Sequence, residues 1–107
     1  MKRLPPSFQK DQRYLRFRVH SKQKHSFEEV VDQIWNTLLS ELGNFQASKA
    51  DIWIVKNKYS HEEKEGIIKV NKEMEDEIRA ALLFLESINE EDAFIEVKKT
   101  SGMIEKI

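Results

Sequence analysis

The 107-residue chain has no cysteine, two prolines and three glycines, and it has no long hydrophobic run. Without cysteine it offers no disulfide framework and no thiolate ligand or nucleophile. A helix that crosses a bilayer needs about 20 mostly apolar residues in a row, and none is present. The charged start is not followed by an apolar stretch, so it does not predict a signal peptide. We therefore expect a reduced, cytoplasmic location and no membrane association.

What is present predicts a single folded domain over residues 1–107. A chain of this length is within the usual size of one domain. Its hydrophobic content is 39%, with two tryptophans and six phenylalanines, which favours a folded core over disorder. The chain divides into an extended basic leader (1–12), a core (13–99) and a C-terminal tail (100–107).

The net charge of −1 hides a strong asymmetry along the chain. Residues 1–24 contain eight lysines and arginines against one aspartate, whereas the remainder contains ten basic and 18 acidic residues. Such a split predicts that one end of the molecule binds an anionic partner. The alternative is that the basic segment is simply solvated.

The first elements have clear periodic signals. Residues 14–20 alternate between polar and apolar side chains, which is typical of a half-buried strand. Next, Ser26 and Glu29 have the spacing of a capping box, and apolar residues recur at helical spacing over residues 27–42. Gly43 is expected to end this helix, because glycine adopts a positive φ at no steric cost.

The rest of the chain predicts two further strands, a second helix and a fourth strand. The strands are expected over residues 52–55 and 66–70, joined by a polar loop. Asn71 is expected to cap a helix that continues to about Ile88, and residues 93–99 form the last strand. The order β-α-β-β-α-β predicts an α+β fold, a ferredoxin-like or RRM-like sandwich with two main helices on one face of an antiparallel sheet.

In that fold the first strand is central, and its polar side chains lie on the face that the helices leave bare. Arginine binds phosphate through its planar, always charged guanidinium, and tyrosine can stack on a base. The third strand offers no aromatic pair, so recognition of RNA backbone and shape is favoured over RRM-type stacking. The alternatives are that Tyr14 is covered by the leader or tail, and that Arg16 and Arg18 pair with nearby carboxylates. The predicted RNA-binding residues are Lys2, Arg3, Lys10, Arg13, Tyr14, Arg16, Arg18, Lys22 and Lys24.

Other candidate sites are fewer. Trp53 lies between two isoleucines, so it faces either the helices or the bare sheet face, and in the second case it is a candidate protein interface. The three histidines are scattered, with no pair at the helical spacing of a zinc site. We therefore predict no catalytic residue, no metal site and no cofactor bound by this chain.

A series of short motifs, in order along the chain, carries a family resemblance. The motifs are residues 4–6, 13–19, 34–36, 53–55, 66–69, 77–82 and 101–102, which read LPP, RYLRFRV, IWN, WIV, GIIK, EIRAAL and SG. Together they resemble the ribonuclease P protein component 2 family of archaeal type, which is similar to a eukaryotic subunit of ribonucleases P and MRP. The chain departs from the family pattern after Gly102, where a basic tail is usual and Glu105 and Lys106 nearly cancel.

The resemblance implies a non-catalytic, RNA-binding subunit of an endoribonuclease. In that family the RNA subunit uses Mg²⁺ to cleave the 5′ end of precursor tRNA, and the protein stabilises the catalytic RNA. The implied partners are ribonuclease P RNA, precursor tRNA and ribonuclease P protein component 3, with a homodimer inside a heterotetramer.

Two other classes of function remain alternatives. The first is a protein-interaction or small-ligand regulatory module without RNA, since a fold does not determine a function. The second is a small hydrolase of acylphosphatase type. That enzyme needs a glycine-rich anion loop after the first strand, and residues 21–25 read SKQKH instead.

Overall fold

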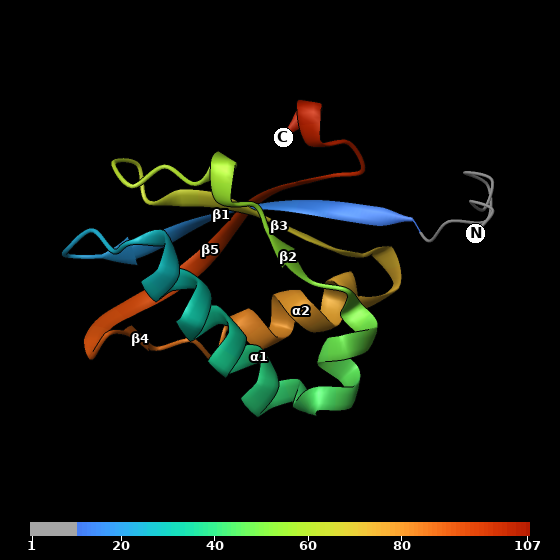
Figure 1. Cartoon of the computed structure of the whole chain (residues 1–107), viewed down its shortest axis with the longest axis horizontal. Coiled ribbons are helices and arrows are strands. Elements are labelled where there is room, and N and C mark those ends of the chain that lie inside the picture. The colour runs from blue at the N-terminus through green and yellow to red at the C-terminus, as the bar shows by residue number, and fades with distance from the viewer. Residues whose placement is uncertain (1–10) are drawn as a thin grey trace.

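A five-stranded antiparallel sheet and two helices make up the computed structural model, which describes residues 11–107 (Figure 1). The sheet order is β2-β3-β1-β5-β4, so β1 lies in the middle. The elements are β1 (Gln12–Ser21), α1 (Phe27–Ala50), β2 (Trp53–Ile54), β3 (Glu65–Asn71), α2 (Glu75–Leu82), β4 (Ser87–Ile88) and β5 (Glu91–Ser101). Short 3-10 turns follow β2, β3 and β5.

Both helices cover the same face of the sheet, and the C-terminal turn lies on the other side (Figure 1). Leu15, Phe17 and Val19 of β1 are at most 1% exposed and belong to one core cluster with residues of both helices. The predicted orientation of these three side chains is therefore confirmed. Because strand side chains alternate, the polar residues between them face away from the helices.

Helix α1 begins as the sequence predicts. The Ser26 hydroxyl accepts a hydrogen bond from the Glu29 backbone N–H (3.2 Å), and the Glu29 carboxylate accepts one from the Ser26 N–H (2.9 Å). This hydrogen bond from the Ser26 backbone lowers the pKa of Glu29. The capping box therefore satisfies two of the N–H groups that a helix start leaves without partners.

Helix α1 does not end at Gly43, although the helical conformation is interrupted there. Gly43 has φ 79° and ψ 166°, so it interrupts the helical run as predicted. A further helical segment then continues to Ala50 and ends at Asp51, which is left-handed with φ 51°. Ala47 and Ala50 are the buried residues of this segment, and so weak an apolar pattern does not predict a helix from the sequence.

The predicted order of four strands is wrong, because a fifth strand, β4, precedes the last one. Asn89 and Glu90 both have positive φ and form a two-residue loop, so Ser87–Ile88 pairs with Glu91–Asp92 as a short hairpin. A strand of two residues is too short to show a period of two. The observed order is therefore β-α-β-β-α-β-β.

The second helix is shorter than predicted. It begins at Glu75, after a 3-10 turn, and ends at Leu82, whereas Leu85 and Ile88 are buried beyond its end. Asn71 makes no side-chain capping bond. Its amide instead donates to the carbonyl of Lys49 (2.5 Å), which joins the end of β3 to the end of α1.

Candidate nucleic-acid interface

The sheet face opposite the helices carries three of the predicted site residues, Tyr14, Arg16 and Arg18. Residues paired across strands share a face, so the register of β1 with its two neighbours identifies what surrounds its polar side chains. Arg16 lies opposite Ile67 and Lys99, and Arg18 lies opposite Glu65 and Glu96. We call this surface the open face; its residues are Tyr14, Arg16, Arg18, His20, Trp53, Glu65, Ile67, Lys69, Phe94, Glu96 and Lys99.

The two arginines of the open face differ in their surroundings. Arg18 is exposed and forms no ion pair among the described residues. The Arg16 side chain is 38% exposed; its Nη1 donates to the Ile107 carbonyl (3.2 Å), and its Nε lies 4.0 Å from a Glu65 carboxylate oxygen. The C-terminal turn thus covers part of Arg16. Pairing with a carboxylate, the alternative for both arginines, therefore applies to Arg16 and not to Arg18 among the described residues. Cover by the tail, an alternative raised for Tyr14, is found at Arg16.

The structure does not bring all the predicted residues onto one surface. Arg13 is two residues before Leu15 on the same strand, so its side chain faces the helices as that of Leu15 does. Its Nε lies 3.9 Å from a Glu75 carboxylate oxygen there. Tyr14 is half-buried on the open face, opposite Lys69. The predicted residues Lys2, Arg3 and Lys10 lie outside the described residues.

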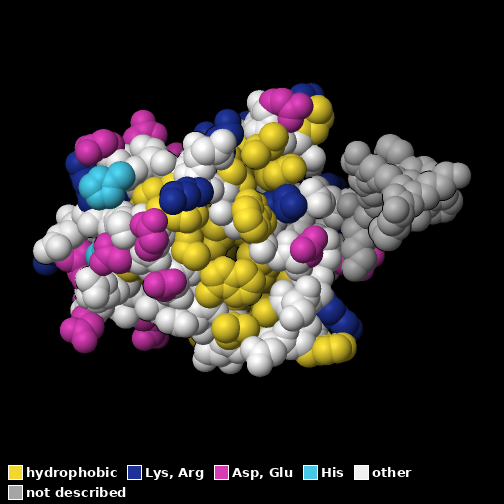
Figure 2. Space-filling model, in the orientation of Figure 1, with side chains coloured by type: hydrophobic (Ala, Val, Ile, Leu, Met, Phe, Trp, Pro, Cys, Tyr) yellow, Lys and Arg dark blue, Asp and Glu magenta, His cyan; other side chains and the backbone are white. Residues whose placement is uncertain are grey.

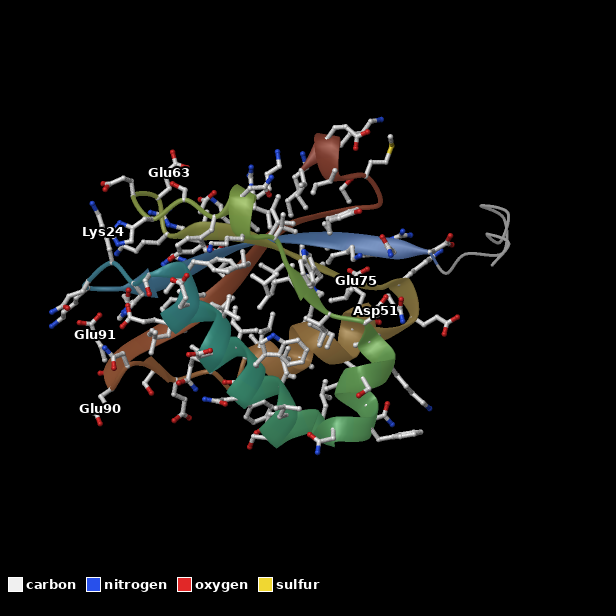
Figure 3. All side chains as sticks on the ribbon, in the orientation of Figure 1. Lys24, Asp51, Glu63, Glu75, Glu90 and Glu91 are labelled. Atoms are coloured by element: carbon white, nitrogen blue, oxygen red, sulfur yellow. The ribbon has the colours of Figure 1, made fainter. Side chains whose placement is uncertain are left out.

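Lys22 and Lys24 lie in the loop after β1 and are exposed. Figure 3 shows Lys24 at the same end of the molecule as Glu63. Lys24 forms an ion pair with Glu62, and this hydrogen bond lowers the pKa of the Glu62 carboxyl. Lys22 is therefore more available than Lys24 to bind an anionic partner.

The sequence did not predict that two aromatic rings, those of His20 and Phe94, stack on the open face. Phe94 on β5 lies opposite His20, and their rings stack with centroids 4.5 Å apart and planes 7° from parallel. Phe94 remains 57% exposed. The alternation of β5 between buried Ala93 and Ile95 was the signal for its outward direction, but only the register places it against His20.

Trp53 takes the outward orientation. It pairs with Lys69 across β2 and β3 and is 63% exposed. Figure 2 shows hydrophobic side chains gathered between β2 and α1. Acidic side chains cluster nearer the loops after β1 and β2. Trp53 therefore has the exposure that a protein-binding residue needs.

The histidines make different local contacts. Besides stacking on Phe94, His20 places its Nε2 2.8 Å from a Glu96 carboxylate oxygen, and this hydrogen bond lowers the pKa of Glu96. His25 is buried; its Nε2 lies 3.1 Å from Glu91, and its carbonyl accepts from the Tyr59 hydroxyl. Burial raises the pKa of Tyr59. These contacts join the β1–α1 loop to the β4–β5 hairpin and to Tyr59.

The part of the chain that the structure describes has neither a cluster of metal ligands nor a membrane-spanning helix. Within residues 11–107, no three histidine, aspartate or glutamate side chains gather closely enough to bind a metal ion. Neither helix of these residues has the length and apolar character needed to cross a bilayer.

The described residues form an α+β domain whose bare sheet face combines arginine, lysine and aromatic side chains. Comparison with known proteins identifies the family: residues 13–107 match the Rpp14/Pop5 family, and the chain belongs to it. The resemblance to ribonuclease P protein component 2 is therefore confirmed.

The relatives cover nearly the whole chain. The ribonuclease P protein component 2 of Pyrococcus furiosus is 30% identical over 106 residues, which are 99% of this chain and 87% of the relative. The protein of the same name from Methanosarcina barkeri is 34% identical over 106 residues, again 99% of this chain and 76% of the relative. A chain in the cryo-EM structure of yeast ribonuclease MRP superposes with a TM-score of 0.69 at 13% identity, covering 89% of this chain and 76% of that one. At that identity the yeast chain supports the fold alone.

Proposed function

We propose that this protein is a non-catalytic subunit of ribonuclease P that binds the RNA subunit and stabilises it for 5′-end maturation of precursor tRNA. The observation that carries the proposal is the family match over residues 13–107, together with relatives named ribonuclease P protein component 2. In this proposal the RNA performs the hydrolysis with Mg²⁺, and the protein supplies binding surface and positive charge.

The open face supports such a role physically. Arg16, Arg18, Lys69 and Lys99 provide cations there, and Lys98 reaches it because its Nζ lies 3.2 Å from Glu65. Cations on such a face neutralise RNA phosphates and release condensed counterions, which supplies much of the affinity for nucleic acid. Glu65 lies within ion-pair distance of Arg16 and Lys98, and the negative charges of Glu65 and Glu96 limit the positive charge of this face. Binding by backbone and shape therefore suits this surface.

The proposal includes protein partners. This chain would pair with a larger subunit, ribonuclease P protein component 3, and two such pairs would form a heterotetramer around a dimer of this chain. Trp53, which is 63% exposed, is the candidate contact for one of these partners. Aromatic residues that are exposed in a free subunit are common anchors of protein interfaces.

Replacing Arg16 and Arg18 together by alanine should flatten the dependence of RNA affinity on salt. Each lost phosphate contact should reduce the slope of log affinity against log salt by about 0.7 to 0.9, because fewer counterions are released. The measurement is a binding titration of ribonuclease P RNA at several salt concentrations. Lys49→Ala is the control, since Lys49 lies in the last turn of α1, where its Nζ is 4.5 Å from the centroid of the Phe45 ring. An unchanged slope in the double variant would remove both arginines from the interface.

Reconstitution tests the function itself. Adding this chain, with component 3, to ribonuclease P RNA should lower the Mg²⁺ concentration needed to cleave precursor tRNA, because protein cations take over part of the charge neutralisation. The rate of cleavage across a Mg²⁺ titration measures this. If the requirement for Mg²⁺ does not change and the chain binds a protein or small ligand without RNA, the interaction-module alternative is the better account.

A further inference from the structure

We propose that His20 and Phe94 form a stacking site for one unpaired nucleobase of the bound RNA, at the opposite end of the open face from Trp53. The site rests on the proposed function, because it presupposes that the open face meets RNA. It deepens that function: it adds a contact with a base to a surface otherwise suited to phosphates.

The geometry of the pair provides a ready stacking surface. One face of the Phe94 ring lies on His20, with centroids 4.5 Å apart, yet the residue is 57% exposed, so part of the ring is accessible to a base. The His20 ring is itself held by the hydrogen bond to Glu96 (2.8 Å). Because both rings are already fixed, a base that stacks on them costs little side-chain entropy.

The charges around the pair select a base rather than a phosphate. A hollow of about 400 Å³ beside the rings is lined by Lys22, Glu86 and Asp92, as well as by His20 and Phe94. Two acidic residues against one lysine disfavour an anion in the hollow itself. Arg18 lies two residues before His20 on the same face, so a phosphate next to the base has a cation within reach.

The base must be unpaired. Bases in an RNA duplex are stacked on their neighbours, and aromatic side chains on a sheet reach only bases that are splayed out of a loop, bulge or single strand. Stacking on a phenyl ring is tolerant of base identity, since every base has a π face. The site therefore recognises single-stranded character and not a particular sequence.

The test is equilibrium binding of a single-stranded oligoadenylate of about ten nucleotides, a length within the range that one such domain covers, to the full chain at several salt concentrations. Phe94→Leu keeps an apolar side chain and removes the ring. We expect it to weaken binding by about tenfold at every salt concentration, with the salt slope unchanged, because stacking releases no counterions. Phe84→Leu is the matched control, since Phe84 is 61% exposed and lies beside α1, not on the open face. Thermal unfolding of both variants checks that they are folded.

The outcomes separate this site from the proposed function. If Phe94→Leu binds the oligonucleotide as the wild type does, or if the loss comes with a changed salt slope, the stacking site is wrong. Failure of the wild-type chain to bind the oligonucleotide also overturns it, even where binding to ribonuclease P RNA is normal. If the chain does not bind ribonuclease P RNA at all, the proposed function fails as well.

Discussion

Replacing Phe17 by alanine is expected to lower the free energy of unfolding by about 3–5 kcal/mol, the range for removing a buried phenyl ring. Phe17 is fully buried in the middle of β1, and it is the largest of the completely buried side chains. The helices and the adjacent strands that surround the Phe17 ring are held by their own backbone hydrogen bonds. They therefore cannot fill all of the space that the ring leaves. The loss therefore combines the transfer of the ring with the cavity that remains.

Urea unfolding followed by circular dichroism measures this loss. Phe84→Ala is the control, because the same atoms are removed from a residue that is 61% exposed. Its effect should stay below about 1 kcal/mol, as for most surface substitutions. Equal losses in the two variants would show that the Phe17 ring is not in the core.

Replacing Gly66 by alanine is expected to destabilise the fold by about 1–3 kcal/mol, the usual cost of overpacking. A Cβ at this position would lie 2.7 Å from Cζ and 2.9 Å from Cε1 of Phe17, and 3.1 Å from Cδ1 of Tyr59. Gly66 lies opposite Phe17 across β3 and β1, so the phenyl ring occupies the space that a side chain would need. The glycine is required here by close approach and not by its backbone angles.

A double variant checks the cause. Phe17→Leu shortens the side chain that clashes, so adding Gly66→Ala to it should cost less than adding Gly66→Ala to the wild type. Gly43→Ala is the control, because Gly43 has φ 79° and a Cβ added there would meet no atom within 4 Å. Its cost comes from backbone strain and should simply add to that of Phe17→Leu. Additive costs at Gly66 would contradict the packing explanation.

Local signals made much of the fold predictable. The alternation of β1, the capping box at Ser26 and the break at Gly43 each depend on residues within four positions of one another, and all are present in the structure. The missed features have weak local signals. Strand β4 has two residues, and its turn uses Glu90 at a positive φ that usually belongs to glycine or asparagine.

The candidate site was less predictable than the fold. The alternating segment begins at Tyr14, so it placed Arg16, Arg18 and His20 on the open face and left Arg13 unassigned. The strand in the structure begins earlier, and Arg13 lies on the helix side beside Glu75. The stack of His20 on Phe94 joins residues 74 positions apart. Nothing in either local segment indicates that partner.

By itself, the sequence determined the family, the α+β class, the inward side of β1 and the start of α1, because short-range periodicity and ordered motifs carry that information. Only the tertiary structure decided which cations share a surface, that Trp53 faces outward, and that Phe94 stacks on His20. It also decided that Arg16 donates to the carbonyl of Ile107, 91 residues away. Strand register and chain-end packing are set by contacts between distant segments, and the free energy of those contacts depends on the whole core.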